Sequence, residues 1–398
     1  MFIVAAKRTA FGSFGGSFAN TTATQLGVAA TQAALAESTL DPSLIDACFF
    51  GSVLFSKDGA YLARHVALQS NCSIHTPALT INRLCGSGFE TVIQACNAIQ
   101  LNQASVAIAG GTENMSQAPL VLHGQDVRFE KGVPLGKGLH LEDALWDGLT
   151  DAHIHTPMGM TAENLAQQYS ISRHECDAYA IRSQQLWAQA HAGGVFRDEV
   201  CPVEVPGKKR GTTVTVDTDE HPRPESTLEG IAKLKPVFSK EGVVTAANAS
   251  GICDGAGTIL VASEEACQQH NLQPLCRIVS HAVTGCDPSI MGIGPVKAIQ
   301  QALQKAGDWD LERDIDRVEI NEAFAAQTLA CAKELQLNMD KTNIHGGAIS
   351  LGHPLGASGS RIMATLAHSF QQTPEQQKVV GSACIGGGQG IAVVLERV

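Results

Sequence analysis

Close pairs of cysteine or histidine, the usual mark of a structural metal site, are scarce in this 398-residue sequence. None of its twelve cysteines forms a CxxC pair, and the closest two, Cys267 and Cys276, stand nine positions apart. The nearest approaches to a ligand pair are Cys72 with His75 and His153 with His155. Because a zinc site combines several such pairs and these two are isolated, we predict no metal.

A long apolar run and an excess of positive charge are also missing. No segment approaches the roughly 18 consecutive apolar residues of a membrane-spanning helix. Lys and Arg number 28 against 39 Asp and Glu, so the formal net charge is −11. Since nucleic acids are bound by basic surfaces, we predict neither a nucleic-acid partner nor a membrane span.

A secretory signal is missing as well, because Met1–Arg8 is a short strand-like stretch that ends in basic residues instead of starting with them. The scattered cysteines are therefore expected to be reduced thiols in a cytosolic-type compartment rather than a disulfide framework.

Strand-like and helix-like segments alternate along the chain, which favours a layered α/β fold. At 398 residues, the chain is too long for one ordinary core and predicts two or three domains. Three landmarks of the first third recur in the last third at offsets of 270, 271 and 276 positions: Ile45-Asp46 with Ile315-Asp316, Gly86-Ser87-Gly88 with Ala357-Ser358-Gly359, and Gly110-Gly111 with Gly386-Gly387. Such a repeat predicts two copies of one α/β domain.

The predicted domain bounds follow from this repeat. They are 1–118 for an N-terminal α/β copy, 119–250 for an inserted helical loop domain, 251–272 for a strand that completes the N-terminal copy, and 273–398 for a C-terminal α/β copy. Within the insertion, residues 207–240 carry seven Lys or Arg against five Asp or Glu. This locally basic segment is either a solvated surface loop or a binding surface for a nucleotide phosphate.

Cys85 stands between a predicted strand, Ala78–Ile81, and a helix that begins near Phe89. The unpaired N–H groups and the positive dipole end of the helix favour a thiolate at such a junction. Gly86 and Gly88 leave room for whatever approaches the sulfur and permit a sharp turn. The alternative is a small buried cysteine beside a tight turn.

Predicted turns of the second copy carry three further reactive or polar residues: Asn321, His353 and Cys384. If the copies pack about a two-fold axis, these turns meet Cys85 near that axis. His353 lies between a glycine and a proline, so the backbone rather than an apolar helix face holds it. Two thiols and an imidazole suit covalent acyl chemistry, in which one thiol attacks, the imidazole takes its proton and the second thiol moves protons on the substrate.

A family resemblance extends from Val4 to the C-terminus, and seven motifs carry it: Tyr61–Val66, Ile81–Gly88, Gly111–Ser116, Pro157–Asn164, Asn321–Phe324, Gly346–Pro354 and Cys384–Gly388. In these motifs the sequence resembles the thiolase family, most closely its 3-ketoacyl-CoA thiolases (acetyl-CoA acyltransferases). The resemblance implies a duplicated α-β-α-β-α layered fold with an inserted loop domain that binds CoA.

The resemblance also implies roles for individual residues. Cys85 is expected to accept the acyl group, and His353 to activate it. Cys384 is expected to act as the acid or base at C2 of the acetyl group. Asn321 is similar to a family residue that orients a water, which together with His353 stabilises the thioester oxyanion. The N–H groups of Cys85 and Gly386 resemble a second oxyanion hole.

Coenzyme A is implied as a substrate, with no permanently bound cofactor. The resemblance places three residues at CoA-contacting positions: Arg223, Ser226 and Ser250. It further implies a homotetramer built as a dimer of dimers. For the compartment, we predict a bacterial-type cytoplasm, with the mitochondrial matrix as the alternative.

The implied reaction is thiolysis of a 3-ketoacyl-CoA by CoA, giving acetyl-CoA and a shortened acyl-CoA through acyl-Cys85. Pro157 stands where short-chain biosynthetic thiolases place a histidine, which favours the degradative type. The alternatives are a biosynthetic acetoacetyl-CoA thiolase, a ketosynthase or hydroxymethylglutaryl-CoA synthase, and a non-catalytic acyl-CoA or lipid carrier. A carrier would be expected to have lost one of the residues Cys85, His353 and Cys384.

Overall fold

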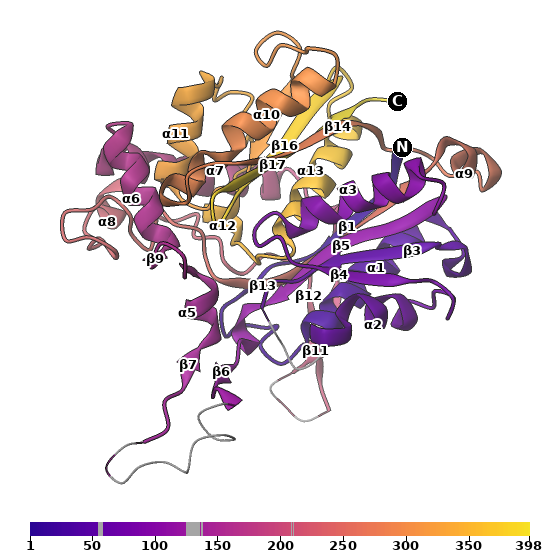
Figure 1. Ribbon diagram of the computed structural model, residues 1–398, viewed down its shortest axis with the longest axis horizontal. Helices are drawn as coiled ribbons and strands as arrows, with labels where there is room; N and C mark the ends of the chain where they lie inside the picture. The colour runs from indigo at the N-terminus through magenta and orange to yellow at the C-terminus, as the bar shows by residue number, and fades with distance from the viewer. Residues whose placement is uncertain (55–58, 125–135, 137, 208, 210) are drawn as a thin grey trace.

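The computed structural model describes residues 1–54, 59–124, 136, 138–207, 209 and 211–398. Two α/β halves lie side by side, with helices α3 and α13 between their sheets (Figure 1). The first half contains β1 (Phe2–Thr9), α1 (Ala23–Ser38), β3 (Ala47–Gly51), α2 (Leu62–Gln69), β4 (Ala78–Ile81), α3 (Ser87–Gln100), β5 (Val106–Asn114) and β13 (Cys253–Ala262). The second half contains β14 (Cys276–Gly285), α10 (Gly294–Lys305), β15 (Arg317–Ile320), α11 (Ala325–Leu335), α12 (Ala348–Leu351), α13 (Ser358–Gln372), β16 (Lys378–Ile385) and β17 (Gln389–Glu396).

Both halves have the same sheet topology. The strand order is β4-β3-β5-β13-β1 in the first half and β15-β16-β17-β14 in the second. The pair β3–β5 in the first half and its counterpart β15–β16 in the second are parallel, and the strands that follow are antiparallel. In the first half β4 adds a further parallel pair with β3. The two sheets join where Phe2 and Ile3 pair with Arg277 and Cys276. The prediction of a duplicated α/β layered fold is therefore confirmed.

Equivalent aspartates mark the repeat at the level of single hydrogen bonds. The Asp46 carboxylate accepts the N–H groups of Ser105 and Val106 at the start of β5, at 2.7 and 3.1 Å. The Asp316 carboxylate accepts the two N–H groups at the start of β16 in the same way, at 2.7 and 3.0 Å. The recurrence of Ile-Asp in the sequence therefore reflects a shared strand-capping contact.

One of the three predicted landmark matches is wrong. Gly110 and Gly111 lie inside β5, which continues to Asn114. Gly386-Gly387 instead lies in the turn after β16. Gly110 is a glycine because a Cβ there would stand 2.4 Å from a ring carbon of Phe50. The offset of 276 positions therefore paired glycines of a packed strand with glycines of a turn, and these are not equivalent in the repeat.

The central layer is formed by α3 and α13, whose first turns touch. A Cβ on Gly88 would lie 2.4 Å from the backbone nitrogen of Ser360. A Cβ on Gly359, the repeat-equivalent residue, would lie 2.3 Å from the backbone nitrogen of Phe89. Gly88 is therefore required by helix packing rather than by room for a substrate, and it holds the turns that precede both helices close together.

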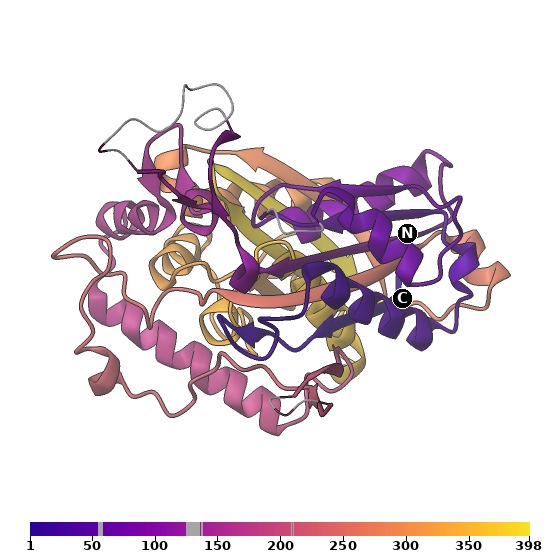
Figure 2. The ribbon, with the colours of Figure 1, turned by 90° about the horizontal axis from the view of Figure 1, so that it is seen from below.

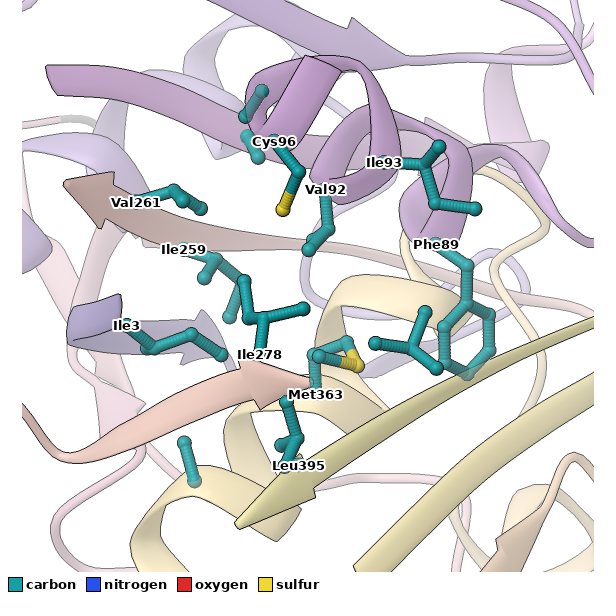
Figure 3. Packing of buried hydrophobic residues seen from close by; sticks show 14 of the residues in the cluster. Ile3, Phe89, Val92, Ile93, Cys96, Ile259, Val261, Ile278, Met363 and Leu395 are labelled. Carbon is teal, nitrogen blue, oxygen red and sulfur yellow. The ribbon is translucent and has the colours of Figure 1, made fainter. Parts of the chain in front are cut away.

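A shared core surrounds these two helices (Figure 3). Side chains from both halves meet in it: Ile3, Phe89, Val92, Ile93, Cys96, Ile259, Val261, Ile278, Met363 and Leu395. Separate cores lie on the outer faces of the sheets, one under α1 and α2 and one under α10 and α11. The molecule therefore has five layers, as predicted from the family resemblance.

The chain between β5 and β13 forms the insertion, seen from below in Figure 2 as the long helix and the loops around it. Its helices are α5 (Ala144–Gly148), α6 (Met158–Gln168), α7 (Arg173–Ala192) and α8 (Leu228–Ile231), and its strands are β6 (Leu120–Val121), β7 (Glu142–Asp143), β8 (Thr150–Asp151), β9 (Thr156–Pro157), β10 (Val200–Cys201), β11 (Val203–Pro206) and β12 (Thr213–Val216). Helices α6 and α7 share an apolar core with α11 of the second half. Two short elements stand elsewhere, β2 (Gly12–Ser13) and α9 (Glu264–Gln269). Among the described helices, none has the length and apolarity needed to cross a membrane.

Candidate active site

Cys85 lies in a tight turn between β4 and α3. Asn82 Oδ1 accepts the N–H of Leu84 at 2.9 Å, and Leu84 adopts a positive φ of 47°. Gly86 caps the helix, which begins at Ser87, two residues earlier than predicted. The backbone N–H of Gly386, from the turn after β16, lies close enough to the Cys85 sulfur to lower the pKa of this thiol. The turn thus presents a half-buried thiol that faces the second half of the molecule.

The resting form of this thiol differs from the prediction. Burial raises the pKa of Cys85 to about 11, although the N–H groups of Gly386 and Cys85 itself lower it. The expectation that the helix end favours a thiolate was therefore wrong for the free protein, because desolvation outweighs the dipole. A base has to remove the proton before this sulfur can attack.

His353 supplies a base that is neutral. It follows Gly352, whose φ of 98° suits glycine and whose Cβ would overlap the sulfur of Cys253. The backbone N–H of His353 donates to the carbonyl of Gly251 at 2.8 Å. The ring nitrogen Nδ1 of His353 lies 2.5 Å from Ser358 Oγ. Burial and, to a smaller degree, the charge of Arg361 lower the pKa of His353 to about 3. The imidazole is therefore unprotonated at neutral pH and can accept a proton.

Asn321 lies directly after β15, beside the histidine. Its backbone N–H donates to the carbonyl of Ser382, which fixes the turn against β16. Its side-chain Nδ2 is 3.3 Å from His353 Nε2. Its Oδ1 is buried and accepts no hydrogen bond from the residues that the structure describes. An amide with one free acceptor can hold a water at this place.

Cys384 is the second thiol and lies fully buried near the end of β16. It packs with Met291 and Ala323, and burial raises its pKa well above the ordinary value, with Cys85 near enough to raise it further. The turn that follows it contains Gly387 and Gly388 at φ values of 78° and 84°, which favour glycine. The glycine triplet is thus explained by this turn, and Cys384 is a protonated thiol at rest.

Two adjoining cavities border His353 and Cys85. The larger, about 390 Å³, is lined mainly by apolar side chains and by Ser250 and His353. The smaller, about 300 Å³, is bordered by Cys85 and Gly386. Leu149, Met158 and Leu355 line both cavities. The described residues contain no group of three or more His, Cys, Asp or Glu side chains that could hold a metal ion.

Arg223 and Ser226 border a third cavity of about 300 Å³, beside His221. The Arg223 guanidinium donates to three backbone carbonyls of its own loop, those of residues 220 to 222, at 2.7 to 2.9 Å. The structure therefore groups Arg223 with Ser226 and places Ser250 at the larger cavity instead. Two basic residues of the predicted basic segment, Lys208 and Arg210, lie outside the described residues.

Glu113 received no role from the sequence, although it lies in one of the family motifs. Its buried carboxylate accepts the N–H groups of Val53, Leu54 and Gly356 at 2.9 to 3.0 Å. It thereby ties loops of the first half to the turn that carries His353. An acidic residue in a strand that begins with an apolar run, β5, was the available signal. Burial raises the pKa of Glu113 to about 7, against the lowering effect of these hydrogen bonds.

Replacing Glu113 with glutamine is expected to change the pH dependence of stability. The carboxyl ionises near pH 4.5 in the unfolded chain but only near pH 7 in the folded one. Between these values the unfolded state binds fewer protons, so the free energy of unfolding of the wild type falls as the pH rises and levels off above pH 7. Glu113→Gln lacks this fall. Thermal unfolding of both proteins between pH 4.5 and 8 measures it, and a wild type that gains stability over the variant with rising pH contradicts it.

Comparison with known families accounts for this arrangement. Residues 1–265 match the model of the thiolase N-terminal domain, and residues 272–397 match the model of the thiolase C-terminal domain. The chain belongs to the thiolase family. As a thiolase it is 54% identical, over 397 residues, to the mitochondrial 3-ketoacyl-CoA thiolase of Homo sapiens, with 100% of this chain and 98% of that protein covered.

A bacterial relative and a solved structure are also similar to this thiolase. An acetyl-CoA acetyltransferase of Chromobacterium violaceum is 46% identical over 395 residues, with 99% of each chain covered. The crystal structure of human mitochondrial 3-ketoacyl-CoA thiolase in complex with CoA superposes with a TM-score of 0.95 at 53% identity, covering 100% of this chain and 98% of that one. The family prediction made from the motifs is confirmed.

Proposed function

We propose that this thiolase cleaves 3-ketoacyl-CoA with CoA to acetyl-CoA and a shortened acyl-CoA, and catalyses the reverse Claisen condensation. One observation carries the proposal: the protonated thiol of Cys85 and the neutral imidazole of His353 border adjoining cavities, and the protonated thiol of Cys384 lies near Cys85 at the end of β16. The names of the human and Chromobacterium relatives support the same chemistry.

In the first half-reaction, His353 takes the proton of Cys85, and the sulfur forms a bond to C3 of the substrate. The C2–C3 bond then breaks, and its electron pair goes to C2 as the enolate of acetyl-CoA. Cys384 gives its proton to C2, which releases acetyl-CoA and leaves an acyl thioester on Cys85. A thiol of high pKa suits this step because it is fully protonated when the carbanion forms.

In the second half-reaction, the CoA sulfur attacks the acyl thioester and the Cys85 sulfur departs. The CoA thiol gives up one proton and the departing sulfur takes one. The Cys384 thiolate takes the proton of the CoA thiol, and the His353 imidazolium gives its proton to the departing Cys85 sulfur. Both groups thereby return to the neutral forms of the resting protein.

Two sets of donors serve the thioester oxygens in this proposal. His353 and a water held by Asn321 Oδ1 stabilise one oxyanion, which is supported by the free acceptor of that amide. The N–H groups of Cys85 and Gly386, which both lower the pKa of the Cys85 thiol, stabilise the other. Such donors are typically worth about 3 kcal/mol each to the transition state.

Coenzyme A is bound as a substrate in this proposal, with no permanent cofactor. The larger cavity suits the pantetheine arm because it is apolar and Ser250 offers a hydroxyl at its wall. Arg223 and Ser226, at the third cavity, are assigned to the nucleotide end. The guanidinium has to leave its own loop carbonyls to reach a phosphate.

Finer properties remain part of the proposal. We assign the protein to the degradative type because of Pro157, with a biosynthetic acetoacetyl-CoA thiolase as the second candidate, which the name of the Chromobacterium relative favours. The domain bounds 1–118, 119–250, 251–272 and 273–398, a homotetramer, and a bacterial-type cytoplasm rather than the matrix are likewise proposed.

The loss of acetoacetyl-CoA enolate absorbance on adding CoA tests the proposed activity directly. We expect loss with the wild type, and no loss would support the acyl-CoA carrier instead. A series of 3-ketoacyl-CoA substrates from four to sixteen carbons then separates the two enzyme types. The degradative type predicts that kcat/KM stays high beyond four carbons, whereas a sharp optimum at four carbons contradicts it.

A further inference from the structure

The two central helices open with serines at equivalent places in the repeat. Ser87 is the first residue of α3, and Ser358 is the first residue of α13. Both are buried, with 0% and 1% of their surface exposed. Their hydroxyl groups differ in the carbonyl that accepts the hydrogen and in the group that meets the oxygen, and the second difference concerns His353.

In the first half, the Ser87 hydroxyl group forms hydrogen bonds with the backbone both as donor and as acceptor. Ser87 Oγ donates its hydrogen to the carbonyl of Leu84 at 2.7 Å. It accepts the backbone N–H of Arg83 at 2.9 Å. A hydroxyl has one hydrogen to donate, so the directions of both bonds are fixed.

In the second half, a proline changes this pattern. Ser358 Oγ donates its hydrogen to the carbonyl of Pro354 at 3.0 Å. Pro354 is also the residue equivalent to Arg83, and it has no N–H to give. Ser358 Oγ therefore accepts no N–H from residue 354, and His353 Nδ1 lies 2.5 Å from this oxygen.

We infer that Ser358 is a positioning residue, whose hydroxyl accepts the Nδ1 proton of His353 and keeps Nε2 bare for the proton of Cys85. The inference rests on the proposed function, in which the unprotonated Nε2 accepts the proton of Cys85. Which nitrogen of a histidine carries the proton is set by the bond that the other nitrogen makes.

A second contact of the ring, with the amide of Asn321, is compatible with this assignment. Asn321 Nδ2 lies 3.3 Å from Nε2 and 3.5 Å from Nδ1, so the amide N–H is nearer to Nε2. An amide N–H can donate to a ring nitrogen only when that nitrogen is unprotonated, so this contact agrees with a bare Nε2. His353 is itself only 6% exposed, so solvent has little access to its ring.

Nitrogen-15 NMR of wild-type protein labelled in histidine tests the inference without any activity. His353 is identified among the 14 histidines by the signals missing from His353→Gln. We expect the proton on Nδ1 at neutral pH. A proton on Nε2 overturns the inference, whatever the fate of the proposed function.

Ser358→Ala supplies the kinetic arm. We expect kcat for thiolysis to fall by roughly 10- to 100-fold with KM almost unchanged, a smaller loss than the about 10⁴-fold that a wrong tautomer costs a serine protease. Ser360→Ala is the matched control, since Ser360 is equally buried on α13 but bonds only the carbonyl of Ala357. The control should keep the wild-type kcat. A Ser358→Ala protein that unfolds at the temperature of the control and keeps its kcat overturns the inference.

Discussion

Cys85→Ser is expected to lower kcat/KM for thiolysis by at least about 10⁴-fold, because removal of an enzyme nucleophile costs up to roughly 10⁶-fold. The hydroxyl has nearly the shape of the thiol but a far higher pKa. The imidazole of His353 therefore removes a proton from this hydroxyl far less readily than from the thiol. Steady-state rates with acetoacetyl-CoA and CoA measure the effect.

A matched control separates this effect from general loss of a cysteine. Cys267→Ser changes a buried cysteine in α9, on the outer face of the first sheet and away from both cavities. Its kcat/KM should stay close to that of the wild type. Near-normal thiolysis by Cys85→Ser would contradict the covalent mechanism proposed above.

Cys384→Ala is expected to split the reaction in two. Carbon–carbon cleavage should slow by about 10²- to 10⁴-fold, the usual contribution of a general acid or base. Exchange of an acyl group between acyl-CoA and CoA involves no proton at C2, so it should persist through Cys85. The first rate is measured with acetoacetyl-CoA, and the second with isotope-labelled CoA and a saturated acyl-CoA.

The ratio of the two rates is the informative quantity. Equal loss of cleavage and exchange would indicate that Cys384 only supports the packing around Cys85, with which it shares the interior of the site. A melting temperature for Cys384→Ala near that of the wild type excludes unfolding as the cause. Equal retention of both rates would contradict the acid and base role.

Much of this site could be predicted from the sequence, because its reactive residues stand in turns with unusual neighbours. His353 lies between Gly352 and Pro354, and Cys384 stands two residues before a glycine triplet. The Ile-Asp repeat located the duplicated strands, since both aspartates cap strands in the same way. Local chemistry of this kind is visible without a structure.

The remaining features depend on packing between distant segments. The charge state of Cys85 was predicted wrongly because its burial comes from both halves of the molecule. Glu113 acquires its importance only when Gly356 donates to it across the interface of the halves. The contact of Ser358 with His353 likewise depends on the conformation of the turn that Gly352 permits.

The most direct test of the central claim is the location of the acyl group. Cys384→Ala is incubated with a saturated acyl-CoA, and peptide mass spectrometry then examines all twelve cysteine positions of the protein. The account predicts one acyl group on Cys85, which added CoA removes as acyl-CoA. An acyl group on another cysteine, or none on Cys85, would contradict it.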